Sequence, residues 1–111
     1  MYDNGHGVAQ DYGKALEWYR KAANQGHAGG QFNLGLKYAN GDGVAQDYGK
    51  AVEWYRKAAD QGHAGGQSNL GTMYDNGHGV AQDYGKAVEW FRKAADQGHA
   101  GGQTNLGTMY D

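Results

Sequence analysis

Apolar residues recur along the chain with the three- and four-residue spacing of a helix that buries one face. Over residues 11–25 the charged side chains fall on the side opposite this apolar stripe. Asp11 is a good N-cap residue, and Gly26 suits the left-handed conformation that ends many helices. The pattern predicts an amphipathic helix over 11–25, here named helix B, whose stripe holds Tyr12, Ala15, Leu16, Tyr19, Ala22 and Ala23.

A second predicted helix, over 28–39, is rich in small residues that allow neighbouring helices to approach closely. Placing successive residues 100° apart sorts it into two faces. The packing face holds Ala28, Gln31, Leu34, Gly35 and Tyr38, and the opposite face holds Gly29, Phe32, Asn33 and Leu36. We name this type helix A. A glycine-rich connector follows it, and Val44 in this connector is expected to tuck under the next helix.

The two-helix pattern returns every 36 residues, and all 21 glycines fall on this lattice. Such a period is typical of stacked arrays, in which each unit buries its apolar face against its neighbours. We therefore expect one solenoid domain over 1–111, made of the repeats 1–36, 37–72 and 73–108 and a duplicated three-residue tail. The six expected helices are 11–25, 28–39, 47–61, 64–75, 83–97 and 100–111.

Aromatic residues recur at the edge and within the stripe of helix B, where they can reach an adjoining helix. We expect all of them to be largely buried, at equivalent places in successive repeats. They are Trp18, Trp54 and Trp90, each followed by Tyr19, Tyr55 or Phe91.

The repeat as a whole resembles the Sel1-like repeat (SLR) family. The resemblance rests on Gln31, Leu34, Gly35, Tyr38, Gly41, Gly43, Val44, Asp47, Tyr48, Lys50, Ala51, Trp54, Tyr55, Lys57, Ala58, Ala59 and Gly62. It covers the whole chain, and the 36-residue period separates it from the related tetratricopeptide repeat, whose period is 34. It implies an all-α, right-handed α/α superhelical solenoid that acts as an adaptor for protein complexes, with helix A lining the concave surface.

Three features depart from that family pattern. Some members hold each repeat with a disulfide, and this chain has no cysteine. Gly30, Gly66 and Gly102 stand where members commonly have alanine, and a helix glycine costs roughly 1 kcal/mol relative to alanine, so we expect lower stability. Finally, repeats 1–36 and 73–108 match at 31 of 36 positions. Recent duplication and consensus design would both produce such similarity.

Charge and composition argue against several classes of partner. The formal charge is −2, from 10 basic and 12 acidic residues, which gives no basic surface for nucleic acid or for membranes. No apolar run approaches the ~20 residues that span a bilayer, and residues 1–10 lack the apolar stretch of a signal peptide. If the chain is complete, we expect a soluble, cytoplasmic protein; its location is otherwise unknown.

The polar residues offer little chemistry. His27, His63 and His99 stand one repeat apart, about 10 Å if neighbouring helices pack normally, so one metal ion cannot bridge them. Ser68 is the only serine and has no neighbouring base in sequence, and the Gly-x-Gly connectors lack the strand and lysine of a phosphate loop. We expect no enzyme activity, no metal site and no cofactor.

The positions that vary between repeats include two on one face of helix A, four residues apart. The charged face of helix B does not vary at all, although free drift of surface residues remains an alternative explanation. We predict a noncatalytic scaffold that binds a peptide or protein on this face, where asparagines could clamp a peptide main chain. The predicted site holds Phe32, Asn33, Leu36, Ser68, Asn69, Thr72, Thr104, Asn105 and Thr108.

A second hypothesis is a structural array, natural or designed, that stacks head to tail. Terminal repeats of solenoids normally carry polar caps, and this sequence shows none. The surface that joins two repeats within a chain could then also join two chains.

Overall fold

Six α-helices make up the part of the chain that the computed structural model describes, residues 12–110, and no strand occurs in that range. Each helix boundary lies within one residue of the sequence prediction, and Asp11, the predicted first N-cap, lies outside the described residues. The helices are α1 (Tyr12–Asn24), α2 (Ala28–Asn40), α3 (Tyr48–Asp60), α4 (Ala64–Asn76), α5 (Tyr84–Asp96) and α6 (Ala100–Tyr110).

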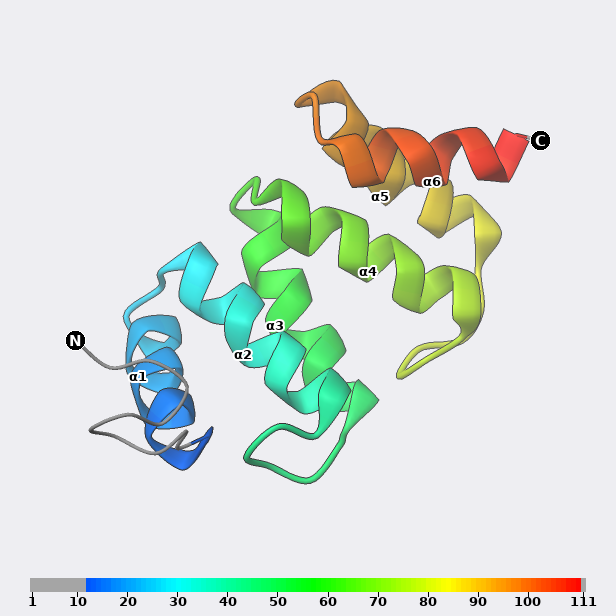
Figure 1. Cartoon of the computed structure of the whole chain (residues 1–111). Coiled ribbons are helices and arrows are strands. Elements are labelled where there is room, and N and C mark those ends of the chain that lie inside the picture. Colours follow the sequence, from blue (N-terminus) through cyan, green and yellow to red (C-terminus); the bar gives the residue numbers. More distant parts are fainter. Residues whose placement is uncertain (1–11, 111) are drawn as a thin grey trace.

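The helices alternate in type and stack in chain order. Helix B corresponds to α1, α3 and α5, and helix A corresponds to α2, α4 and α6. Each helix packs against the next, and α4 also contacts α6. The stack is elongated, 48 × 27 × 26 Å, with α1 and α6 at opposite ends (Figure 1). This arrangement confirms the predicted all-α solenoid.

Capping residues fix where the helices begin and end. The Asp47 carboxylate accepts a hydrogen bond from the Lys50 backbone N–H at 3.1 Å, and Asp83 does the same for Lys86 at 3.0 Å. Gly62 follows α3 with a φ of 89°, in the left-handed region that glycine adopts without strain. The predicted caps of the helix B type are therefore confirmed at α3 and α5.

Most of the core lies where successive repeats meet. A central cluster, drawn from α3, α4 and α5, contains Ala51, Val52, Tyr55, Ala59, Leu70, Met73, Tyr74, Ala87 and Phe91. A smaller cluster contains Leu16, Ala23 and Leu34, and Val44 packs against it as predicted. The central cluster draws on two successive repeats, and Val44 and Trp54 of the second repeat pack against the smaller cluster of the first, so the helices depend on their neighbours for burial.

Close helix approach explains several glycines in helix A. A Cβ added at Gly71 would lie 2.7 Å from Cδ1 and Cε1 of the Phe91 ring, which real side chains do not tolerate. A Cβ at Gly66 would lie 3.0 Å from the Cβ of Ala58. At Gly71 the entropic penalty of glycine is therefore offset by packing that alanine would disrupt, whereas alanine at Gly66 would require a small shift of its neighbour.

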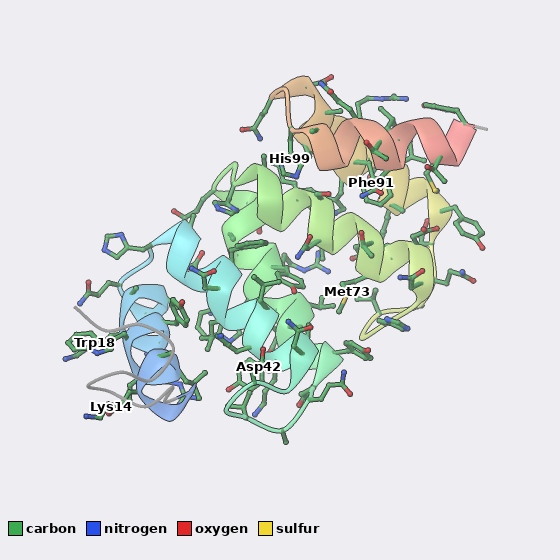
Figure 2. The ribbon with its side chains drawn as sticks, viewed as in Figure 1. Lys14, Trp18, Asp42, Met73, Phe91 and His99 are labelled. Atoms are coloured by element: carbon green, nitrogen blue, oxygen red, sulfur yellow. The ribbon has the colours of Figure 1, made fainter. Side chains whose placement is uncertain are left out.

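The tryptophans differ from the prediction that all three are largely buried. Trp18 is 68% exposed and points away from the helices (Figure 2), and Trp54 and Trp90 are half-buried. Trp54 packs against the Leu16, Ala23 and Leu34 cluster of the preceding repeat, whereas no preceding repeat is present for Trp18 in the described range. Their burial is thus set by the neighbouring repeat.

The aromatic residues that follow the tryptophans agree better with the prediction. Tyr55 and Phe91 are each only 2% exposed, whereas Tyr19 is half-buried. The same difference between the first repeat and the later ones therefore affects this position too.

Candidate interaction surface

The predicted site residues lie on α2, α4 and α6, but their exposure differs from helix to helix. Thr104 and Thr108 on α6 are exposed, and Ser68 on α4 is buried, with 4% of its surface accessible. The others, Phe32, Asn33, Leu36, Asn69, Thr72 and Asn105, are half-buried. These nine residues, here called the row, therefore include exposed, half-buried and buried positions.

The apolar members of the row pack against the central cluster. The Phe32 ring centroid lies 6.0 Å from that of Tyr55 and 4.9 Å from that of His63. Leu36 packs against the same cluster while remaining half-buried. These two side chains form an apolar edge whose outer part faces solvent and whose inner part supports the fold.

The hydroxyl residues of the row hydrogen-bond within their own helices. Thr72 Oγ1 donates to the Ser68 carbonyl at 3.1 Å, and Thr108 Oγ1 donates to the Thr104 carbonyl at 3.0 Å. Such bonds to the carbonyl four residues earlier satisfy the hydroxyl donor locally. The two threonines thus keep a fixed orientation on the surface.

Two asparagines of the row, Asn69 and Asn105, link neighbouring helices. Asn69 forms a side-chain hydrogen bond with Tyr55; burial raises the pKa of the Tyr55 hydroxyl, and this bond partly opposes the rise. Phe91 occupies the equivalent place in the next repeat and has no hydroxyl. There, Asn105 Nδ2 instead donates to Ser68 Oγ at 3.4 Å.

A ladder of glutamines joins the repeats and was not recognised from the sequence. Gln61 Nε2 donates to the Gly26 carbonyl and to Gln31 Oε1, both at 2.8 Å. Gln97 Nε2 repeats this pattern on the Gly62 carbonyl, at 2.9 Å, and on Gln67 Oε1, at 2.8 Å. The sequence held one indication of this network: the polar residue Gln31 lies on the packing face of helix A and recurs in each repeat.

One histidine, His63, has a structural role that its sequence position did not indicate. His63 is the N-cap of α4, and its Nδ1 accepts a hydrogen bond from the Gly66 backbone N–H at 3.0 Å. Burial and the nearby His99 lower the pKa of His63, which favours the neutral ring that this cap requires. In residues 12–110 no three metal-ligating side chains gather into a cluster.

The outer face of helix B carries aligned cations and aromatic rings. Lys57 Nζ lies 4.6 Å from the Trp54 ring, and Lys93 Nζ lies 4.5 Å from the Trp90 ring. Both distances are in the range of cation–π attraction. On α1 a surface depression is lined by Lys14, Glu17, Trp18, Arg20, Lys21 and Asn24. This depression lies away from the predicted site.

Stacked helix pairs with a 36-residue period define an α/α solenoid repeat protein. The chain belongs to the Sel1 repeat family, because a sequence model of the Sel1 repeat matches residues 1–27, 28–63 and 64–99. Proteins of this family are typically non-catalytic scaffolds that mediate protein interactions. The sequence-based resemblance is therefore confirmed.

Solved structures agree with this assignment. A protective antigen of uropathogenic Escherichia coli with an SLR fold is 48% identical, with a TM-score of 0.90 over 93% of this chain and 22% of its own. A Sel1 repeat protein from Oxalobacter formigenes is 43% identical, with a TM-score of 0.88 over 99% of this chain and 45% of its own. This chain therefore spans less than half the length of either protein.

Cysteine-rich protein B from Helicobacter pylori is a third similar structure. It is 30% identical, with a TM-score of 0.81 over 86% of this chain and 72% of its own. No curated protein sequence gave a match. None of the helices in residues 12–110 combines the length and apolar character needed to cross a membrane.

Proposed function

We propose that this chain is a non-catalytic scaffold that binds an extended peptide or protein segment on the face formed by α2, α4 and α6. The observation that carries the proposal is the variation between repeats at two positions of these helices, Phe32/Ser68/Thr104 and Leu36/Thr72/Thr108, beside an asparagine that is the same in every repeat. Contact between α4 and α6 makes part of this row continuous from one repeat to the next.

The row offers different chemistry at its two ends. On α2 the half-buried Phe32 and Leu36 supply an apolar edge, and on α6 the exposed Thr104 and Thr108 supply a polar one. A bound segment would therefore place an apolar side chain near α2 and polar groups near α6. The concave shape implied by the family resemblance would hold such a segment along the row.

The asparagines are suited to hold a peptide main chain. A side-chain amide has two N–H donors and an oxygen with two acceptor sites. The bonds that Asn69 and Asn105 make within the protein use only part of this capacity. Asn33, Asn69 and Asn105 can each contribute to a peptide spaced along successive helices.

A non-catalytic role also agrees with the polar side chains. The lowered pKa of His63 follows from burial and from His99, and its Nδ1 serves as a helix cap. The Ser68 hydroxyl accepts a hydrogen bond from the side-chain amide of Asn105. We therefore propose no catalytic residue and no cofactor, and protein or peptide rather than nucleic acid or membrane as partner.

The proposal is tested by panning a random-peptide display library on the immobilised chain and measuring the affinity of an enriched peptide. Asn33→Ala removes one amide and should weaken binding about two- to tenfold, the effect of one hydrogen bond. Glu17→Ala, on the exposed outer face of α1, is the matched control and should bind as the unmodified chain does. Weakening by Glu17→Ala but not by Asn33→Ala would refute the assigned face.

A further inference from the structure

The chain makes one kind of contact twice, where a helix B packs on the preceding helix A. The Tyr55 ring of α3 lies over Gly35 of α2, so that a Cβ on this glycine would come within 2.6 Å of the ring. The Phe91 ring of α5 lies over Gly71 of α4 in the same way, at 2.7 Å. Each contact combines an aromatic knob with a glycine that leaves room for it.

The polar half of this contact is also repeated. The glutamine after each helix B, Gln61 or Gln97, donates to a backbone carbonyl and to a glutamine of the preceding repeat. The receiving glutamine is held in place because its own Nε2 donates to a carbonyl, from Gln67 to Ala59 at 3.2 Å. Knob, glycine and glutamine pair together define one repeat-to-repeat interface.

At the α6 end, the receiving half of this interface is present without a partner in the described part of the chain. A Cβ added at Gly107 would meet nothing within 4 Å. Gln103 Nε2 donates to the Ala95 carbonyl at 3.4 Å, which orients this side chain as Gln67 is oriented. Leu106 is half-buried, whereas its equivalent Leu70 is fully buried.

At the α1 end, the inserting half is present. Tyr19 and Ala22 are half-buried, whereas their equivalents Tyr55 and Ala58 are 2% and 0% exposed. Gln25, which corresponds to Gln61, is exposed. Trp18 projects from the same helix and is 68% exposed (Figure 2).

We propose that a second copy of this chain docks its α1 on the α6 face of the first. Tyr19 of one copy covers Gly107 of the other, and Gln25 Nε2 donates to the Gly98 carbonyl and to Gln103 Oε1. A second copy fits this face because helix α1 carries nearly the same residues as α3 and α5, which fill the two internal interfaces. The two surfaces lie at opposite ends of the stack (Figure 1).

Such docking joins unlike surfaces, so it builds open chains rather than a closed two-fold dimer. The docking surfaces involve the ends of the stack, and the proposal is independent of peptide binding on the α2, α4 and α6 row. A failure of either proposal would therefore leave the other standing.

Sedimentation velocity of the 111-residue chain, from about 10 µM to about 1 mM, tests the proposal. We expect the mean mass to rise with concentration through dimers to longer species. Gly107→Ala places a methyl group where the Tyr19 ring would lie and should lower the association constant about tenfold or more. It should leave thermal unfolding unchanged or raise its midpoint, because the site has free space.

Gly29→Ala is the matched control, since it also adds a methyl group in open space on a helix A. It should associate as the unmodified chain does. Trp18→Glu blocks the docking surface on α1. Circular dichroism verifies that Trp18→Glu and Gly107→Ala are folded. Trp18→Glu and Gly107→Ala should each associate far more weakly alone, but a mixture should form a one-to-one dimer that grows no further.

That mixed dimer is specific to head-to-tail docking, because each variant retains one intact surface. A chain that stays monomeric to about 1 mM would overturn the proposal. So would a closed dimer, or association that Gly107→Ala leaves unchanged. If Trp18→Glu fails to fold, the comparison of Gly107→Ala with Gly29→Ala still decides the question.

Discussion

At the scale of single residues, the glycines of helix A have two different environments at equivalent positions. Gly71 faces the buried Phe91 ring, whereas Gly107 faces open space. Helix propensity favours alanine at both, by about 1 kcal/mol. The difference between the two sites therefore isolates the packing contribution.

We predict opposite effects of the same substitution at these sites. Gly71→Ala should destabilise the chain by about 1 to 3 kcal/mol, as expected for overpacking a core. Gly107→Ala should leave stability unchanged or increase it by up to about 1 kcal/mol. Urea unfolding of both variants at low protein concentration measures this. Equal effects would show that Phe91 does not need the space at Gly71.

Individual residues also show which features of the structure could be predicted from the sequence. The caps Asp47 and Asp83 could be predicted, because capping depends on local backbone geometry. The exposure of Trp18 could not be predicted from its local sequence, because nearly the same residues surround Trp54 and Trp90, which are half-buried.

At the scale of helices, the boundaries and the buried faces of both helix types, A and B, were predicted from the sequence. What the pattern did not show is how helices of successive repeats are joined. The bonds from Gln61 to Gln31 and from Gln97 to Gln67 cross 30 residues of sequence, and their partners are identified only once the helices are stacked. The local pattern shows only that a glutamine recurs on a packing face, and it does not identify the partner of that glutamine.

Helix α4 depends on a titratable cap. The pKa of His63 is lowered by burial and by His99, so the folded chain binds a proton at His63 less readily than the unfolded chain does. Stability therefore rises with pH across this titration. The contribution is fully present above the unfolded pKa of about 6.5 and decreases as the pH falls below it.

We predict that His63→Asn reduces this pH dependence, because asparagine caps a helix without titrating. Between about pH 7.5 and about pH 5.5, the variant should lose less stability than the unmodified chain. His27→Asn is the control, since His27 caps α2 without a side-chain hydrogen bond, and it should keep the original pH dependence. Chemical unfolding at both pH values measures the effect. A pH dependence unaltered by His63→Asn would contradict the account.

At the scale of the whole molecule, stability comes from contacts between repeats. The larger cluster draws on α3, α4 and α5, so the middle of the stack holds most of the buried apolar side chains. The first and last helices contribute fewer, as Tyr19 and Leu106 show by being half-buried. An equivalent substitution should therefore have different effects at different repeats.

The tryptophans provide this comparison. Trp54→Ala removes a half-buried ring from the cluster around Leu34 and should cost about 1 to 3 kcal/mol. Trp18→Ala removes a ring that is 68% exposed and should cost less than about 0.5 kcal/mol. Guanidinium unfolding at low concentration measures both. Similar losses would mean that neighbouring repeats do not determine the burial of this position.

The proposed function is also a property of the whole molecule, because it needs equivalent helices of successive repeats to present one surface. That surface consists of the row on α2, α4 and α6 and includes Asn33, Asn69 and Asn105. Its two ends differ in polarity, so it should select segments by their side chains as well as by their main chain.

The most direct test of the proposed binding surface is to map where an enriched display peptide contacts the chain. Changes in the NMR shifts of backbone amides and side-chain amides record these contacts. The account predicts that the largest shifts occur on the row, including the Asn33, Asn69 and Asn105 side chains. It predicts no comparable shifts on the outer face of helix B around Glu53 and Lys57. Shifts confined to that outer face would contradict the claim that helix A forms the interaction surface.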